Sequence, residues 1–431
     1  MKKSNLLISK EKIFCFFLAL IVITPAYIDG PGGVAIYNYL LIIGLVYSCW
    51  GMKIKKPIHM RFYFIYAIVF CLINIYHERY TASLWDTLFI FVMILALNNY
   101  IQSKNCFLRC IDMLIYPVFP ISILGILEYF TGKNFFQLLN NSGVVINLSE
   151  SRFSMTRIMG FTGMTINYGM YLFLICGLII YRLSHMGKSN KQLLFWVTYV
   201  LAAINIFMTM SRTCILAFLG SQIILLPIAS GAKCLIMGLL MSMICMVGIV
   251  FIEISKLGEN LLSSISNMAF MIMAVFNSRF SSNISSTFGG NLGGVGNRFD
   301  LYGWVWEKVA DSRWLGQTDD FFYRTLMDNG YWLEKWSIEV NYLNVLYYSG
   351  IIGLVAEISL FLRTIFISLK SRCKVWEKKL SFKLVVLCLM FFCIISMFMV
   401  SLQEEKRVLI IIIILCQIYF DFEEKGTVYG F

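Results

Sequence analysis

Residues 167–184 read NYGMYLFLICGLIIYRLS, a run in which Arg182 is the only charged residue. A helix needs about 17–25 mainly apolar residues to cross the hydrocarbon core of a bilayer, and this run is long enough. The whole chain is 59% hydrophobic and 14% charged, with a mean hydropathy of +0.75. An ordinary soluble domain carries about 25% charged residues. We therefore predict an all-α, polytopic membrane protein.

Hydrophobic runs of similar length mark about twelve expected spans. They fall at 13–28, 34–51, 62–76, 84–100, 106–130, 167–184, 192–210, 213–230, 234–252, 342–362, 384–401 and 407–420. We interpret a further apolar run at 261–276 as a surface-lying or re-entrant amphipathic piece. As a span it would turn the basic loop SLKSRCKVWEKKLSFK outward, against the preference of Lys and Arg for the cytoplasmic side. Residues 1–431 are treated as one integral membrane domain.

The net charge of +12 would suggest nucleic-acid binding in a soluble protein. In a chain of this composition we attribute it to basic cytoplasmic loops that face anionic lipid. Most Lys and Arg of the short loops fall inside when the N-terminus is placed inside, so both termini are expected in the cytoplasm. Two long loops, 131–165 and 253–340, then face outward and are large enough to carry chemistry.

The thirteen cysteines and three histidines do not indicate a metal site. No CxxC motif occurs, and most of the cysteines lie inside apolar runs, where cysteine behaves as a small hydrophobic residue. Neither a metal ion nor an organic cofactor is expected.

Residues 296–317, GNRFDLYGWVWEKVADSRWLGQ, interrupt the hydrophobic pattern in the second outer loop. Glycines lead to Asn297, a good N-cap, and then to a helix-like run. The first turn of such a helix aims N–H groups and Arg298 at one point, which suits a phosphate or diphosphate. The alternative is a flexible loop with a solvated arginine. From Tyr302 onward the apolar residues recur at helical spacing, so the helix is expected to rest on the membrane or to pack on its own protein.

Three further arginines stand where expected spans meet the outer side. Arg212 follows Ser211 in a short outer turn; it can snorkel to the surface or, among small neighbours, point into a cavity between helices. Arg152 and Arg157 directly precede a span, where the commoner role of arginine is that of an interfacial anchor. Ten residues separate Arg152 from Gly163.

Two acidic residues are candidates for a general base. Glu339 ends the second outer loop, and Asn341 opens the next span. A carboxylate at the edge of the bilayer, among several arginines, can accept a proton from a reacting hydroxyl. The alternative is a solvated acid at the end of a loop. Glu128, at the outer end of the fifth span, is the weaker candidate.

Taken in order, these segments resemble the O-antigen polymerase and O-antigen ligase superfamily. Ser211-Arg212-Thr213 matches its SR motif, NRFDLYGWVWEKVADSRWLGQ its loop arginine and aromatic helix, and EVNYLNVLYYSGIIGLV its HN-aliphatic-GliG stretch. The spacing from Arg152 to Gly163 fits the RX10G pattern of polymerase loops. The resemblance implies a GT-C-like bundle of transmembrane helices with a large helical periplasmic loop.

Two departures from the family pattern bear on the assignment. Val340 stands at the position of the ligase histidine, with Glu339 just before it, which favours a polymerase over a ligase. The sequence Trp-Leu-Gly at 314–316 replaces the proline-containing turn of the family.

The resemblance implies a metal-independent glycosyltransferase of the bacterial inner membrane. It would join undecaprenyl-diphosphate-linked oligosaccharides on the periplasmic face, as a repeat-unit polymerase for O-antigen or capsule. Arg298 and Arg212 are expected to stabilise the leaving diphosphate, and Glu339 to act as the base. The residues expected to bind substrate are Arg152, Arg157, Asn341 and Tyr302.

The implied partners are a lipid-linked oligosaccharide donor and acceptor and membrane lipid, and not nucleic acid. A chain-length regulator and a flippase are further candidates. Two other functions stay open: an O-antigen ligase that transfers glycan to lipid A core, and a transporter or flippase of lipid-linked sugar. Transporters carry charged or polar residues at mid-membrane positions, whereas the expected spans here are nearly free of charge at their centres.

Overall fold

A computed structural model describes most of the chain outside the segments near 51–59, 141–150, 231–294 and 371–379. The described residues are 2–25, 27–31, 34–49, 60–101, 103–140, 151–152, 155–186, 190–230, 295–319, 321–326, 332–335, 338, 340–370, 380–398 and 404–429. They form an all-α bundle with two short antiparallel strand pairs outside it.

Twelve helical segments make up the bundle. They are α1 (Lys2–Ile23), α2 (Ile36–Cys49), α3 (Arg61–Tyr76), α4 (Tyr80–Tyr100), α5 (Lys104–Ile115), α6 (Val118–Thr131), α7 (Thr165–His185), α8 (Asn190–Met208), α9 (Arg212–Ser230), α14 (Asn341–Lys370), α15 (Phe382–Ser396) and α16 (Glu404–Tyr429). The elements outside the bundle are η3 (Phe135–Leu139), β1 (Ser151–Arg152), β2 (Met155–Thr156), η4 (Gly160–Thr162), α13 (Val295–Val309), η5 (Ala310–Ser312), β3 (Tyr323–Leu326) and β4 (Trp332–Lys335).

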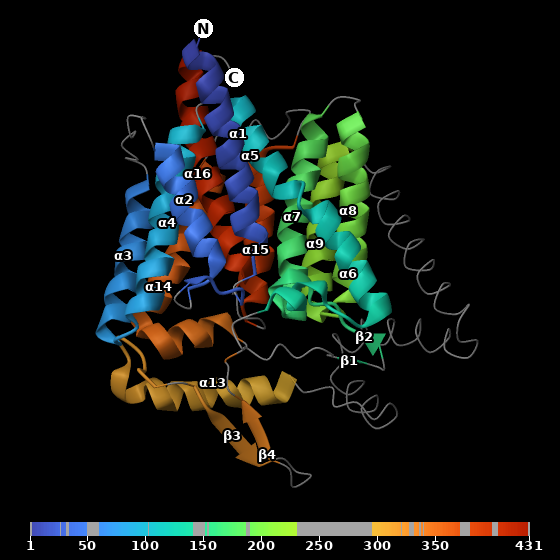
Figure 1. Cartoon of the computed structure of the whole chain (residues 1–431). Coiled ribbons are helices and arrows are strands. Elements are labelled where there is room, and N and C mark those ends of the chain that lie inside the picture. Colours follow the sequence, from blue (N-terminus) through green and yellow to red (C-terminus); the bar gives the residue numbers. More distant parts are fainter. Residues whose placement is uncertain are drawn as a thin grey trace, which may run out of the picture.

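The bundle has two distinct ends (Figure 1). Helix α1 begins and α16 ends at one of them, which we call the terminal end. Helix α13 and both strand pairs lie at the other, the loop end, where α13 runs across the bundle axis. The two chain termini therefore belong to the same side of the bundle.

A helix overlaps each expected span that the structure describes, but the bounds differ; α1, for example, covers Lys2–Ile23 where 13–28 was expected. The run at 234–252 and the amphipathic piece at 261–276 lie outside the described residues. The expected span 106–130 is divided into α5 and α6 at Pro117, which has no N–H to continue the helical hydrogen-bond ladder. Within the described residues, four helical stretches are long and apolar enough to cross a membrane: Lys104–Thr131, Thr165–His185, Lys191–Met208 and Asn341–Lys370. Shorter apolar helices accompany them.

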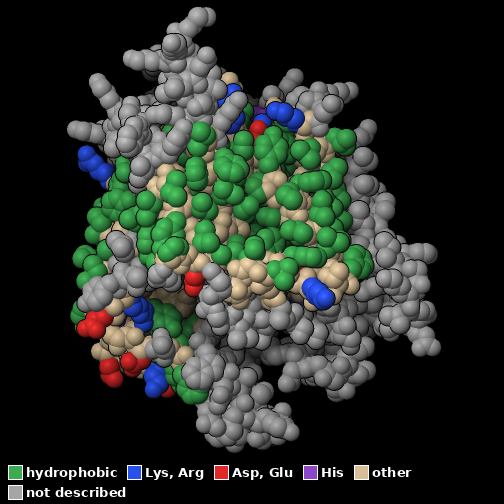
Figure 2. Space-filling view, viewed as in Figure 1, with side chains coloured by type: hydrophobic (Ala, Val, Ile, Leu, Met, Phe, Trp, Pro, Cys, Tyr) green, Lys and Arg blue, Asp and Glu red, His purple; other side chains and the backbone are tan. Residues whose placement is uncertain are grey.

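On the face of the bundle shown in Figure 2, a band of hydrophobic side chains has charged side chains above and below it. On α3 and α14 this band includes exposed Ile65, Leu72, Val355, Leu362 and Phe366. Large apolar side chains arranged in this way are unfavourable in water and suit contact with lipid. The fold is therefore consistent with a membrane protein.

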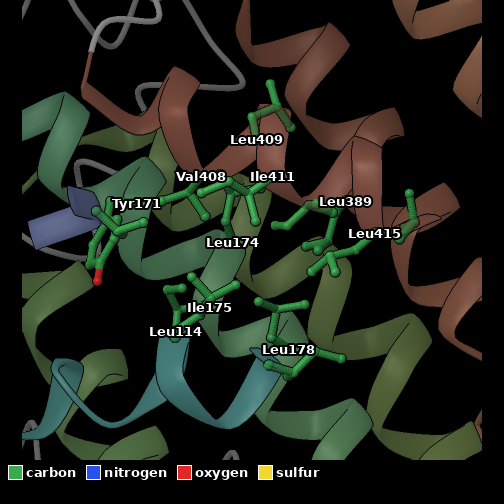
Figure 3. Close-up of a cluster of buried hydrophobic side chains, with 14 of the residues drawn as sticks. Leu114, Tyr171, Leu174, Ile175, Leu178, Leu389, Val408, Leu409, Ile411 and Leu415 are labelled. Carbon is green, nitrogen blue, oxygen red and sulfur yellow. The ribbon is translucent and has the colours of Figure 1, made fainter. Parts of the chain in front are cut away.

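Helix α7 is the buried centre of the bundle. Its side chains are buried almost without interruption from Thr165 to Leu183. Gly177 allows a close approach, because a Cβ there would lie 2.8 Å from Leu389 Cδ2 of α15. Figure 3 shows the cluster around α7, which includes Leu114, Leu174, Ile175, Leu178, Leu389, Val408, Leu409, Ile411 and Leu415. The run quoted at the outset thus forms the helix on which α5, α15 and α16 converge.

A buried ion pair joins α5 to α7 toward the terminal end. Arg182 donates from Nε to Asp112 Oδ1 and from NH2 to Asp112 Oδ2, the latter at 2.9 Å. Both residues are 8% exposed. The two-point contact offsets part of the cost of removing both charges from water. Arg182 is therefore bound within the bundle.

Breaking this pair from one side should destabilise the bundle more than removing both charges. Asp112→Leu or Arg182→Met leaves one charge buried without its partner, and we expect the free energy of unfolding to fall by about 3–5 kcal/mol. The Asp112→Leu/Arg182→Met double variant should recover most of that loss. Thermal unfolding in detergent, followed by tryptophan fluorescence, measures the difference. Additive losses in the double variant would contradict a coupled pair.

Candidate functional site at the loop end

The expected site residues that the structure describes all belong to the loop end (Figure 1). Arg152 lies in β1, Arg157 follows β2, Arg212 begins α9, Arg298 and Tyr302 lie in α13, and Asn341 begins α14. Glu339 lies outside the described residues. Of Arg152, Arg212, Arg298 and Tyr302 the structure describes the backbone and not the side chain. The geometry of the site therefore comes from Arg157, Asn341 and their surroundings.

Arg157 is held against the turn that joins α8 to α9. Its Nε donates a hydrogen bond to the carbonyl oxygen of Thr209 at 3.0 Å. The turn continues through Met210, which has a φ of 50°, to buried Ser211 and then to Arg212. The side chain of Arg157 thus contacts the turn that leads into Arg212, although the two arginines are far apart in the sequence.

A buried carboxylate fixes the loop that carries Arg157. Glu128, in the last turn of α6, accepts at Oε1 from Met159 N at 2.9 Å and from Asn134 Nδ2 at 3.2 Å. Its Oε2 accepts from Gly160 N at 3.1 Å. Both oxygens of this weaker candidate base are engaged by N–H donors of the loop. Glu128 therefore anchors the residues that directly follow Arg157.

Asn341 belongs to a cluster of polar side chains around a buried glutamate, which the sequence did not lead us to predict. Its Nδ2 donates to Glu357 Oε1 at 2.7 Å, and Lys406 Nζ of α16 lies 3.6 Å from Glu357 Oε2. Glu357 is 1% exposed. Its only signal in the sequence is that it is the one carboxylate within the expected span 342–362. An ionisable group there is usually paired and often functional.

The apolar face of α13 packs on the first half of α14. The shared cluster contains Leu301, Val305, Val309, Phe321, Ile338, Val340, Leu343, Leu346 and Tyr347. The helix therefore packs on its own protein, which was one of the two expectations for it. Its first residue is Val295, so Asn297 lies inside the first turn and is not the N-cap. Trp306 and Trp314 remain 61% and 66% exposed.

Helix α14 bends at Gly350, which has φ 62° and ψ −166°. The turn that follows α13 lies directly against this kink. Gln317 N donates to the carbonyl oxygen of Tyr347 at 2.6 Å, and Gly316, at φ 85°, faces the kink with no side chain. Residues 314–316, where the chain departs from the expected turn, and residues 349–353 of the expected HN-aliphatic-GliG stretch therefore touch each other.

Comparison with protein-family models and with curated proteins gives no match. Within the described part of the chain, no three His, Cys, Asp or Glu side chains meet in a way that could hold a metal ion. What the loop end offers is a set of arginines on loops and helix starts, a buried carboxylate–lysine pair and exposed aromatic residues. Such an arrangement can bind an anionic group at a membrane surface.

Replacing Glu128 by glutamine should loosen the loop that carries Arg157. Glutamine has a similar shape, but its NH2 group would face a backbone N–H, so at least one charge-assisted hydrogen bond is lost. We expect a local cost of about 1.5–3 kcal/mol, seen as faster hydrogen exchange in residues 157–163. Lys133→Ala, an exposed change next to α6, is the matched control. Unchanged exchange in Glu128→Gln would refute the anchoring role.

The Asn341–Glu357 contact can be tested by exchanging amide and carboxylate. Asn341→Asp places a second carboxylate against Glu357, and we expect the free energy of unfolding to fall by about 3–5 kcal/mol. Asn341→Asp combined with Glu357→Gln restores one amide facing one carboxylate and should recover most of the stability. Melting temperatures of the purified variants measure both effects. Equal melting temperatures for Asn341→Asp and its combination with Glu357→Gln would argue against the contact.

Proposed function

We propose that the protein is a polysaccharide repeat-unit polymerase of the bacterial inner membrane. In this proposal it is a metal-independent glycosyltransferase with about twelve spans in a GT-C-like arrangement. Both termini lie in the cytoplasm, and the loop end faces the periplasm. The observation that supports the proposal most directly is the contact of Arg157 with the turn that leads into Arg212. It gathers arginines from two separate motifs at the end of the bundle opposite the termini.

The reaction transfers the growing glycan from its lipid diphosphate to the next lipid-linked repeat unit. A hydroxyl oxygen of the acceptor attacks the anomeric carbon of the donor sugar. The bond from that carbon to the diphosphate oxygen breaks, and the diphosphate leaves with the electron pair. The proton of the hydroxyl passes to a base, for which Glu339 is our assignment.

The leaving diphosphate needs positive charge that is already in place as its own charge develops. Arginine suits this role, because its guanidinium is weakly hydrated and binds phosphate at two points. Arg212 is the first residue of α9, and Arg298 lies in the first turn of α13. Unpaired N–H groups of a helix start favour an anion, so the backbone supports the same assignment. Arg152, Arg157, Asn341 and Tyr302 would place the donor and acceptor.

A ligase is less well supported than a polymerase. Val340, at the position of the ligase histidine, is 0% exposed and lies in the apolar cluster shared by α13 and α14. A transporter of lipid-linked sugar has one observation in its favour, the contact of buried Glu357 in α14 with the partly exposed Lys406 in α16. The glycan made by a deletion strain distinguishes the three functions. Single repeat units would indicate that a polymerase is lost, and long glycan that is not attached to lipid A core would indicate that a ligase is lost. Lipid-linked repeats that accumulate in the cytoplasm would indicate that a transporter is lost.

Substitutions of the two arginines test the catalytic assignment. Arg298→Ala and Arg212→Ala should each lower the rate of polymer formation by about 10²–10³, because each removes one group that stabilises the leaving diphosphate. Arg298→Lys should also be poor, since lysine cannot make the two-point contact. Chain-length ladders of surface glycan in a complemented deletion strain give the readout.

The matched control for these variants is Arg313→Ala. Arg313 is exposed after α13, and its Nε donates to the nearby carbonyl oxygen of Ala310 at 2.8 Å. This variant should keep the wild-type ladder at equal protein abundance in the membrane. Wild-type ladders from both Arg298→Ala and Arg212→Ala would overturn the assignment.

A further inference from the structure

The short turn between α3 and α4 reaches over to the loop that follows α13. His77 is 5% exposed, and its Nε2 donates to the carbonyl oxygen of Leu315 at 2.6 Å. A carbonyl oxygen can only accept a hydrogen bond, so this ring nitrogen carries the proton. Arg79 NH2 donates to the carbonyl oxygens of Thr318 at 3.0 Å and Gln317 at 3.4 Å. Two side chains from one turn therefore hold three carbonyl groups of the loop, those of Leu315, Gln317 and Thr318.

The opposite side of the same loop is bound to the kink in α14. Ile351 N donates to the carbonyl oxygen of Arg313 at 2.8 Å, and Ile352 N donates to that of Trp314 at 3.2 Å. Gln317 N donates in the other direction, to Tyr347. Residues 313–318 are thus held between the α3–α4 turn and the kink, and we call this three-part contact the clamp.

The clamp brings backbone against backbone, so it tolerates little displacement. A Cβ at Gly316 would lie 2.6 Å from the carbonyl oxygen of Tyr347 and 2.7 Å from Gly350 N. A Cβ at Gly350 would lie 2.5 Å from Leu315 N. Arg79 also contacts α14 directly, because its guanidinium lies 4.5 Å from the centre of the Tyr348 ring. This is the distance range of a cation–π contact.

We propose that His77 and Arg79 are positioning residues that fix the direction of α13 through the clamp. The part of this proposal that concerns activity rests on the polymerase function proposed above. Helix α13 runs without interruption from Val295 to Val309, so its two ends move together. Arg298 lies about 17 Å along the helix axis from Val309, at 1.5 Å per residue. A small tilt at the clamp therefore moves Arg298 by a larger distance, and a misplacement of about 1 Å can cost about 10² in rate.

His77 and Arg79 reach residues 315–318 from a distant part of the sequence, through the short turn between α3 and α4. The other hydrogen bonds described for residues 313–318 reach α14, Lys308 at the end of α13, or η5. Removing the His77 and Arg79 side chains therefore leaves residues 313–318 held from the α14 side alone, so the hydrogen bonds of that side open more easily.

The first arm of the test measures the clamp without reference to activity. Hydrogen exchange of the full-length protein in nanodiscs reports the amides of Gln317, Ile351 and Ile352, which are bonded across the clamp. His77→Phe keeps a buried ring without the donor, and we expect about three- to tenfold faster exchange, with a larger effect when it is combined with Arg79→Ala. Glu78→Gln, an exposed change between the two residues, is the matched control and should leave exchange unchanged.

The second arm measures polymerisation of a lipid-linked repeat by the same preparations. We expect His77→Phe and Arg79→Ala to lower kcat about tenfold or more with little change in KM, because α13 is misdirected at the reacting step. His77→Gln supplies an N–H donor of similar reach and should restore much of kcat. A merely structural role would lower the amount of active protein and would not be rescued in this way.

The outcomes separate the inference from the proposed function. Unchanged exchange in His77→Phe/Arg79→Ala overturns the clamp, whatever the activity. Faster exchange with wild-type kcat overturns the positioning role. If the wild-type protein makes no polymer, the proposed function fails, while the exchange arm still decides whether the clamp exists.

Discussion

A chain buried in hydrocarbon must bond every backbone N–H and C=O group within itself, because no water is there to do so. Continuous helices meet this constraint along most of the bundle. In α14 the continuous helical hydrogen bonding is interrupted at Gly350, where the φ and ψ angles leave the helical region. The groups set free at the break are bonded by the loop after α13, with Ile351 and Ile352 as donors and Tyr347 as acceptor. The loop after α13 is thus part of how a broken helix that is long and apolar enough to cross a membrane completes its hydrogen bonding.

Buried acidic side chains in the bundle are stabilised in three different ways. Asp112 is paired with an arginine, Glu357 with an amide and a lysine, and Glu128 with loop N–H groups. Each carboxylate joins elements that are separate in the sequence. Since an isolated charge in the buried interior is very unfavourable, each carboxylate also holds its partners in one position. The Glu128 contacts matter most for the site, because they lie directly beside Arg157.

The hydrophobic runs predicted the helices well, because length and apolar content are local properties of the sequence. The break at Pro117 divides a run that appeared continuous, although proline carries the signal for it. The bend at Gly350 was not predicted, because glycine is common within membrane helices and the bend depends on the loop that lies against it. The expected site residues were placed at one end of the bundle, and yet neither Glu357 nor His77 was recognised. Their roles depend on Lys406 and on Leu315, which are distant in the sequence.

Helix α7 lies at the centre of the bundle, and the last helix of the chain covers part of it. Val408, Ile411 and Leu415 of α16 join the cluster around Leu174 and Ile175. During synthesis α7 leaves the ribosome well before α16 does. Until α16 is made, this apolar face of α7 lacks the cover that Val408, Ile411 and Leu415 give it. The packing around α7 is therefore completed late, and a shortened chain without α16 would leave the central helix partly uncovered.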